Sequence, residues 1–186
     1  LKTAQVLKYN SKQARSIRIQ VTDRGGLSFQ KAFTIQVIPN NHAPSDISLS
    51  NASVNEHCAP ATVVGAFSVT DPDSGQSYSF TLVPGVGSEG NGGFFIEGNV
   101  LKSAAALDHE ATPVCSLRVR AEDNGAPAMS VEKNFLIMVN DINDTPTALA
   151  LNLATVAENL TACASVCVLS AIDPDSGEHF TYALVA

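Results

Sequence analysis

Residues 71–75 read Asp-Pro-Asp-Ser-Gly, and the same five residues return unchanged at 173–177, 102 positions later. A second match lies upstream, where Ile-Arg-Ile-Gln-Val-Thr-Asp at 17–23 resembles Leu-Arg-Val-Arg-Ala-Glu-Asp at 117–123, at an offset of 100. Self-similarity at a fixed period indicates a tandem array. A period of about 100 residues is the size of a whole small sandwich domain, and it is too long for a solenoid unit that depends on its neighbours.

The repeat divides the chain into three parts. We expect the C-terminal part of one repeat at 1–43, one complete repeat at 44–145, and the N-terminal part of a third at 146–186. Both ends of the sequence would then fall inside a repeat. The sequence is therefore expected to be a fragment of a longer array.

Within one repeat, the segments between turn signals alternate with a period of two. Leu117, Val119 and Ala121 share one face of a predicted strand, and polar side chains occupy the other face, which is typical of a half-buried antiparallel strand. Further short strands are expected at 32–37, 63–69, 79–83, 94–96 and 134–139. No run of helical length carries a 3.6-residue apolar stripe, and 101–107 is expected to form at most a turn. Roughly seven short strands per repeat predict an all-β fold of tandem Ig-like Greek-key β-sandwiches.

The composition supports a β-sheet core and argues against several functions. Apolar residues make up 45% of the chain, Trp is absent and aromatics reach only 6%, so the core must consist mainly of Val, Leu, Ile and Ala. The net charge of −7 makes nucleic acid a poor partner, since phosphate contacts need a Lys and Arg surface. No apolar stretch is long enough to span a membrane, and no signal peptide is visible.

The acidic residues gather at predicted strand ends and loops, where backbone carbonyls are also free. The acids of the complete repeat that form these clusters are Glu56, Asp71, Asp73, Asp108, Glu110, Asp123, Asp141 and Asp144. Oxygen ligands from several loops suit Ca²⁺, whereas zinc prefers closely spaced Cys or His, and the four histidines are scattered. Asx-Pro and Asx-Gly pairs are also ordinary turn formers, which is the alternative for each cluster taken alone. The complete set in one repeat favours calcium.

The order of these motifs resembles the cadherin repeat. The motifs are Val-Asn-Glu at 54–56, Asp-Pro-Asp at 71–73, Leu-Asp-His-Glu at 107–110, Arg-Ala-Glu-Asp-Asn-Gly at 120–125 and Asp-Ile-Asn-Asp-Thr-Pro at 141–146. The resemblance covers nearly the whole chain. It implies calcium sites between successive repeats, to which the earlier repeat contributes its Glu, its Leu-Asp-x-Glu acids and its linker. The later repeat contributes Asp-x-Asp and the Asp before Gly.

The boundary near residue 145 is called here the second joint, and the resemblance implies a well-equipped calcium site there. The implied ligands are Glu56, Asp108, Glu110, Asp141, Asn143, Asp144, Asp173 and Asp175. Among them Asp141 is expected either to ligate or to cap. Thr145 stands where the family usually has Asn, so it would offer only its carbonyl.

The boundary near residue 43, the first joint, departs from the family pattern. Lys8 and Asn10 stand where carboxylates are expected, and Pro-Asn-Asn-His at 39–42 replaces the acidic linker. A cationic side chain at a ligand position repels a metal ion. The ligands that remain are Asn41, Asp71, Asp73 and Asp123. We therefore expect one weak calcium ion at this joint or none, and hence a more flexible hinge.

Four cysteines in an extracellular repeat suggest disulfides. Cys58 follows Glu56 by two positions and Cys115 follows Glu110 by five. If both carboxylates approach one calcium ion, the two thiols start near each other. A Cys58–Cys115 bridge is therefore the expected pairing.

Other motifs are less specific. Cys163 and Cys167 would bridge each other or pair with residues outside the sequence, and Asn51 and Asn159 begin N-glycosylation sequons of a glycoprotein. There is no Gly-x-Ser-x-Gly elbow, no phosphate-binding Gly loop and no His-Glu-x-x-His motif, so no enzyme is expected.

The leading functional hypothesis is calcium-dependent adhesion at the cell surface. Its partner would be another adhesion protein or a second copy, and the membrane anchor of the parent protein would lie outside this fragment. The alternative is a structural spacer or carbohydrate-binding module in a secreted or surface protein. An exposed apolar patch on one face would favour recognition, whereas uniformly polar faces would favour the spacer.

Overall fold

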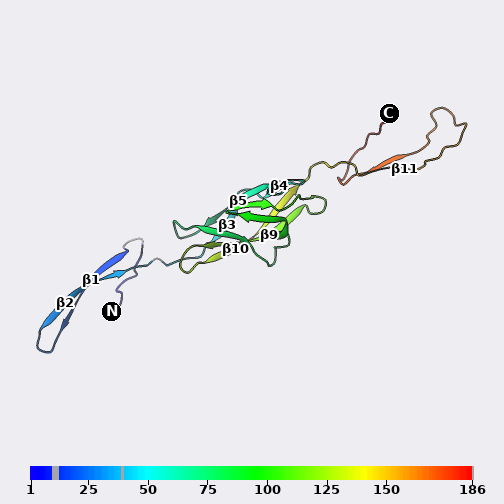
Figure 1. Cartoon of the computed structure of the whole chain (residues 1–186). Coiled ribbons are helices and arrows are strands. Elements are labelled where there is room, and N and C mark those ends of the chain that lie inside the picture. The colour runs from blue at the N-terminus through cyan, green and yellow to red at the C-terminus, as the bar shows by residue number, and fades with distance from the viewer. Residues whose placement is uncertain (10–12, 39, 186) are drawn as a thin grey trace.

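The computed structural model describes residues 1–9, 13–38 and 40–185. It is elongated, with an N-terminal hairpin, a central sandwich and a C-terminal strand pair following one another along its length (Figure 1). Among the described residues, no helix is long and apolar enough to cross a bilayer.

The central sandwich contains two four-stranded sheets. The first sheet has the order β3-β5-β8-β7, from β3 (Asp46–Leu49), β5 (Val63–Thr70), β8 (Val100–Ser103) and β7 (Phe94–Glu97). The second has the order β4-β10-β9-β6, from β4 (Ser53–Asn55), β10 (Ser130–Asn140), β9 (Val114–Asp123) and β6 (Tyr78–Leu82). A short 3₁₀ turn, η1 (Asn91–Gly93), precedes β7. The predicted all-β sandwich is confirmed.

One pairing in this sandwich is parallel. Strand β10 pairs antiparallel with β9 but parallel with β4, with Asn140 opposite Asn55. Strands β4 and β10 are the first and the last strand of this sheet along the chain. They therefore end together, at the side of the repeat that faces the C-terminal part. This shared end positions the candidate site described below.

The core fills the space between the two sheets. Leu117, Val119 and Ala121 of β9 are fully buried, as their period-two pattern predicts. Phe67 stacks on Phe80 with ring centroids 5.4 Å apart and meets the edge of Phe135 at 5.5 Å. Each fully buried aliphatic or aromatic side chain stabilises the fold by about 1.5–3 kcal/mol through the apolar surface it removes from water.

The expected turn at 101–107 is wrong in its first part, because Val100–Ser103 forms strand β8. Leu101 and Ser103 are both fully buried there, between β5 and β7 on the sheet. Three alanines that follow this strand dilute the period-two signal in the sequence. Pairing with β5 and β7, which local sequence does not report, decides the structure.

The flanking parts are two-stranded. In the N-terminal part β1 (Ala14–Thr22) and β2 (Ser28–Gln36) form an antiparallel hairpin, and in the C-terminal part β11 (Ala148–Leu151) pairs antiparallel with β12 (Leu169–Ile172). The central sheets use only residues from Asp46 to Asn140. The division into 1–43, 44–145 and 146–186 stays a proposal.

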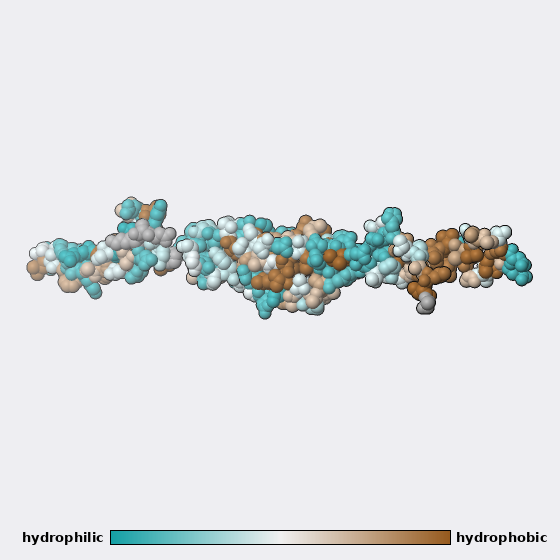
Figure 2. Space-filling model, turned by 90° about the horizontal axis from the view of Figure 1, so that it is seen from above, coloured by the Kyte–Doolittle hydropathy of each residue, from teal (hydrophilic) through white to brown (hydrophobic). Residues whose placement is uncertain are grey.

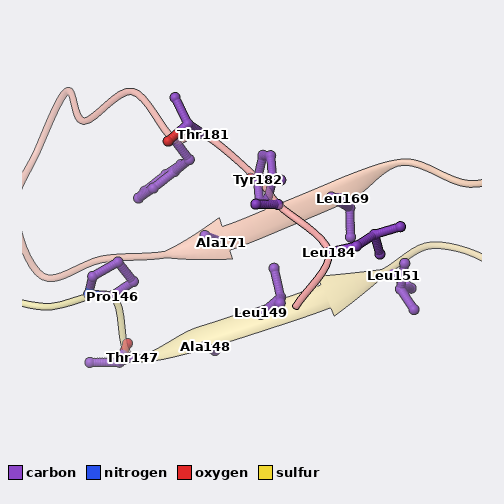
Figure 3. Close-up of a pocket in the computed structure, with 12 residues that line it drawn as sticks. Pro146, Thr147, Ala148, Leu149, Leu151, Leu169, Ala171, Thr181, Tyr182 and Leu184 are labelled. Carbon is purple, nitrogen blue, oxygen red and sulfur yellow. The ribbon is translucent and has the colours of Figure 1, made fainter. Parts of the chain in front are cut away.

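Hydrophilic residues cover the narrow neck between the central sandwich and the C-terminal part, whereas apolar residues gather on the C-terminal part itself (Figure 2). The strand pair β11–β12 borders an apolar hollow with Leu149, Leu169, Tyr182 and Leu184 around it (Figure 3). The described residues that line this hollow carry no charged side chain. The ionisable groups that need an explanation lie at the joints.

Candidate metal centre

The second joint is built at the shared end of β4 and β10. The amide of Glu56, just after β4, donates to the carbonyl of Asn140 over 3.0 Å. His57 then donates from its amide to the carbonyl of Leu107 over 2.9 Å, which brings the loop before β9 to the same end. Three segments that are far apart in sequence thus meet at one place: 56–57, 107–110 and the linker from Asp141 onward.

Glu56 holds two of these segments together. Its side chain is buried, and Oε2 accepts the amide of His109 while Oε1 accepts the amide of Ile142, both over 2.7 Å. These two backbone donors hold the pKa of Glu56 below its usual range. The carboxylate is therefore charged at neutral pH, and it fixes where Asp108 and Glu110 stand relative to the linker.

The predicted carboxylates gather in two overlapping groups. One oxygen each from Glu56, Asp108 and Glu110 lie within 4.8 Å of one another, and the same holds for Glu110, Asp144 and Asp175. Glu110 belongs to both groups. The second group crosses the joint, since Asp175 belongs to the C-terminal part.

Hydrogen bonds organise the far side of the joint. The amide of Asp144 donates to Oδ2 of Asp175 over 2.6 Å, and the amide of Asp175 donates to Oδ1 of Asp173 over 3.0 Å. Oδ1 of Asp175 is buried and has no hydrogen-bond partner. A buried carboxylate oxygen without a donor is costly and favours a cation beside it.

The electrostatics of Glu110 point the same way. A hydrogen bond from its own amide lowers the pKa of Glu110, but partial desolvation by its neighbours and the nearby Glu56 and Asp141 carboxylates outweigh this and raise it. Desolvation is the larger of the raising causes, and the two neighbouring negative charges add to it. A bound divalent cation would relieve that repulsion.

Asp108, Asn143 and Asp141 make further contacts at this joint. Oδ1 of Asp108 accepts the amide of Ala111 over 2.7 Å, which shapes the loop. Asn143 is exposed and donates from its side chain to the carbonyl of Asp144 over 2.7 Å. Asp141 lies in a third group, with His109 and Glu110.

Two histidines at this joint were missed by the sequence reasoning. Nε2 of His57 lies 3.3 Å from Oδ1 of Asp144, and His109 belongs to the group with Asp141. The available signal was their position, since each is adjacent in sequence to a predicted ligand. Their spacing of 52 positions conceals that they reach the same end of the repeat.

At the first joint, Asp123 is held by protein donors. Asp123 is buried, and its Oδ1 accepts the amides of Gly125 and Met129 over 3.0 Å each. Nδ2 of Asn41 donates to both oxygens, at 3.0 and 3.1 Å. Burial raises the pKa of Asp123, but these donors outweigh it and leave the pKa below its usual value.

Protein donors also hold Asp73 and Asn41. Oδ2 of Asp73 accepts the amide of His42 over 2.7 Å, and its Oδ1 lies 3.1 Å from Nδ1 of the same residue. Nε2 of Gln76 donates to Oδ1 of Asn41 over 2.6 Å. His42 and Gln76 are thus further members of this site that the sequence reasoning missed.

Asp71 completes the first joint. Its Oδ1 accepts the amide of Asp73 over 2.7 Å, and its Oδ2 is buried without a partner. Over the described part of the chain, no trio of metal-type ligands forms at this joint. Asn10 and Pro39, which belonged to the expected departure from the pattern, lie outside the described residues.

The cysteines carry free thiols in this structure. Cys115 is buried in the core and Cys58 packs against the same core cluster. Burial raises the pKa of the Cys115 thiol. The Cys58–Cys115 bridge stays a prediction.

Comparison with known proteins agrees with this architecture. A family model described as the cadherin domain matches residues 50–140. Protocadherin gamma-B7 of Homo sapiens is 30% identical over 99% of this chain and 21% of its own length, and protocadherin gamma-A2 of Pan troglodytes is 33% identical over 96% and 20%. The chain thus spans about a fifth of the length of these relatives.

A solved structure of a protocadherin gammaB7 EC3-6 cis-dimer superposes with a TM-score of 0.59 and 25% identity, covering 94% of this chain and 46% of that one. The matched region, the motif order and the sandwich with its acidic ends agree with one another. Residues 50–140 of this chain form a cadherin repeat.

Proposed function

We propose that the chain is an extracellular adhesion segment in which Ca²⁺ binds the second joint and stiffens it. The observation that carries this proposal is the trio of Glu110, Asp144 and Asp175, whose oxygens lie within 4.8 Å of one another across the joint. Oxygen donors from several segments are the ligands that Ca²⁺ takes, in flexible geometry with six to eight oxygens. The family relationship supports the same ion, since cadherins are generally calcium-dependent.

The proposed ligand set is the one implied by the sequence. Its members are Glu56, Asp108, Glu110, Asn143, Asp144, Asp173 and Asp175, with Asp141 at the margin. The buried unpartnered Oδ1 of Asp175 and the crowded Glu110 supply the reason for a cation. Carboxylates from both sides of the joint repel one another, and a divalent ion converts that repulsion into attraction.

Calcium would act on the joint by mass action. An ion that binds the assembled joint, and binds neither part alone, stabilises the assembled form by about 2.7 kcal/mol when its free concentration is 100 times the dissociation constant. The angle between the two parts becomes fixed as a result. A fixed angle suits a rod that presents a binding surface at a distance from the membrane.

For the first joint we propose at most one weak calcium ion at Asn41, Asp71, Asp73 and Asp123. Protein donors already hold Asp73 and Asp123. A cation would have to displace the Asn41 amide group before it reached the Asp123 oxygens. The free oxygen of Asp71 is the remaining attraction.

Adhesion to another adhesion protein, or to a second copy, is preferred over a spacer role because the outer face of β9 and β10 carries exposed apolar side chains. Leu136 is 62% exposed, Met138 49% and Val114 40%, and Met138 stands opposite Val114 in the strand register. Apolar groups gathered on one sheet face favour recognition. The dimer named for a protocadherin relative supports the same preference. The relatives of this chain are protocadherins, and we infer no enzymatic role.

Calorimetric titration of the full chain with CaCl₂ tests the proposal, beside Asp144→Asn and the charge-matched control Glu122→Gln, whose side chain is exposed on the outer face of β9. We expect saturable binding in the wild type and control that is lost or weakened at least about tenfold in Asp144→Asn, since ligand charge sets calcium affinity. Thermal unfolding of the same three proteins, with and without CaCl₂, should show a higher Tm only for the proteins that bind calcium. Equal isotherms for all three proteins would overturn the assignment, and no binding below millimolar calcium would favour the spacer.

A further inference from the structure

The second joint contains nitrogen ligands beside its oxygens. Three ligand atoms lie within 4.8 Å of one another, one each from His109, Glu110 and Asp141. We propose that this trio binds a borderline-soft divalent cation, Zn²⁺ being the best match, and that zinc bound there takes Glu110 away from the calcium site. The trio is here called the histidine site.

The ring of His109 is prepared for metal binding through its far nitrogen. Nδ1 lies 2.7 Å from the carbonyl oxygen of Val139. A carbonyl oxygen only accepts hydrogen bonds, so Nδ1 carries the proton and the neutral ring keeps a lone pair on Nε2. Metal-bound histidines commonly donate their other N–H to a backbone carbonyl, which fixes tautomer and orientation.

The backbone around His109 is fixed as well. Its amide donates to Oε2 of buried Glu56 over 2.7 Å. Val139, whose carbonyl holds the ring, is itself buried in strand β10. The imidazole is therefore anchored at two points by groups that belong to the core of the repeat.

The donor set fits zinc in kind and in number. One imidazole nitrogen and two carboxylate oxygens give three protein ligands and leave a fourth position for water, as in tetrahedral zinc sites. Ligand atoms in such a shell are about 3.3 Å apart, given bonds of about 2.0–2.2 Å. Glu110 and Asp141 are exposed, so their side chains can turn by the small amount that this requires.

A second histidine trio at the same joint is the weaker candidate. It consists of Glu56, His57 and Asp144. Both oxygens of Glu56 already accept backbone amides, and Nε2 of His57 lies 3.9 Å from Oε2. Each Glu56 oxygen can offer a metal only its second lone pair, whereas Nε2 of His109 carries neither a proton nor a hydrogen-bond partner among the described residues when Nδ1 donates to Val139.

Competition follows from the shared carboxylate. Glu110 is a member of the histidine site and of both oxygen groups at this joint. Zinc bound to Glu110 would leave the calcium site one carboxylate short and weaken its affinity. This competition rests on the proposed calcium function, whereas zinc binding itself does not.

The test uses three variants of the full chain, titrated with ZnCl₂ in calcium-free buffer and separately with CaCl₂. His109→Asn keeps an amide donor near the place of Nδ1, so the Val139 contact can persist, and removes Nε2. His57→Asn is the matched control, and Asp144→Asn removes a calcium ligand that lies outside the histidine site. Long-range ¹H–¹⁵N spectra of the imidazoles report directly which ring nitrogen binds zinc.

We expect zinc to bind the wild type with one equivalent, to shift Nε2 of His109, and to weaken more than about tenfold in His109→Asn, since even indirect ligand partners cost about 10–100-fold. His57→Asn and Asp144→Asn should keep zinc, and His109→Asn should keep calcium. Prior loading with zinc should weaken calcium binding in the wild type.

Loss of zinc binding in His57→Asn instead, or no saturable zinc binding, would overturn the histidine site. A wild type that binds zinc but shows no calcium binding would overturn the proposed function and leave the zinc site supported.

Discussion

Asn41 donates from its side-chain nitrogen to both carboxylate oxygens of Asp123, although 82 positions separate the two residues. The same nitrogen lies 2.8 Å from the carbonyl of Pro127, and Asn41 Oδ1 accepts Nε2 of Gln76. An amide group thus stands beside the carboxylate where a cation would otherwise stand. The first joint is fastened by protein hydrogen bonds, while the second joint leaves carboxylate oxygens facing one another.

Replacing the Asn41 amide by a carboxylate should raise the calcium affinity of the first joint. In Asn41→Asp the donor to Asp123 disappears and two negative groups face each other, so calcium affinity at this joint should rise by on the order of tenfold. Calorimetry of Asn41→Asp beside Asn41→Ala measures this. The alanine variant removes the same donor without adding charge and should gain less calcium affinity than Asn41→Asp. Identical isotherms for the two variants would show that Asn41 does not control the joint.

The close contact between Asn41 and Gly125 should make a larger residue at position 125 destabilising. A Cβ at Gly125 would lie 2.0 Å from Oδ1 of Asn41 and 2.1 Å from its Cγ. Gly125→Ala must therefore displace Asn41, at a cost of about 1–3 kcal/mol in the free energy of unfolding. Gly92→Ala is the control, because nothing lies within 4 Å of a Cβ there. Urea denaturation should separate the two variants, and equal stabilities would contradict the packing argument.

The ion pairs on β9 and β10 should make stability depend on pH. Glu132 accepts Nε and Nη2 of Arg118 at Oε2 over 2.9 and 2.7 Å, and those of Arg120 at Oε1 over 2.9 and 2.6 Å. The hydrogen bonds from Arg118 and then Arg120 hold the pKa of Glu132 below its usual value. The folded pKa is the lower one, so the stabilisation is complete above about pH 4.5 and is lost as the pH falls through the folded pKa.

Glu132→Gln should therefore lower Tm by a few degrees at pH 7 and by less and less as the pH falls below 4.5. Differential scanning calorimetry between pH 7 and pH 3 follows the difference. Glu122→Gln on the neighbouring strand should show no comparable trend. A Tm difference that persists unchanged at pH 3 would mean that the variant acts through packing and not through charge.

The predicted Cys58–Cys115 bridge can be read directly from the secreted protein. Peptide mapping without reductant should yield one linked peptide that contains both residues, and reduction should separate it. By the loop-entropy argument a bridge closing a loop of this length stabilises the fold by about 4 kcal/mol. Cys58→Ser should then match the reduced wild type in urea denaturation. Free thiols at both positions in the native map would end this prediction.

Sequence reasoning reached the parts of this molecule that depend on local pattern. The alternation of Leu117 with Val119 identified a buried face, and the acids were expected at strand ends, where Glu110 and Asp144 do meet. These signals survive because side chains alternate across a strand and because loops carry the polar residues. The family resemblance supplied the order in which the acids combine.

What the sequence could not reveal depends on pairings between distant segments. The roles of His109 and His42 follow from contacts with Val139 and Asp73 that lie about 30 positions away in the chain. Strand β8 likewise depends on its neighbours β5 and β7. A periodic pattern reports which face of a segment is buried, but it does not report which segment covers it.

The parallel pairing of β4 with β10 decides how a repeat responds to a pull on its two ends. Ser53, Val54 and Asn55 stand opposite Met138, Val139 and Asn140, and both strands run in the same direction. The chain enters the repeat upstream of β4 and leaves it after β10, so tension drives the two strands past each other along their length. Their hydrogen bonds are then loaded in shear, all at once, and not opened one at a time as in an unzipped hairpin. The central sandwich is therefore arranged to carry tensile load across this strand pair without opening it from one end.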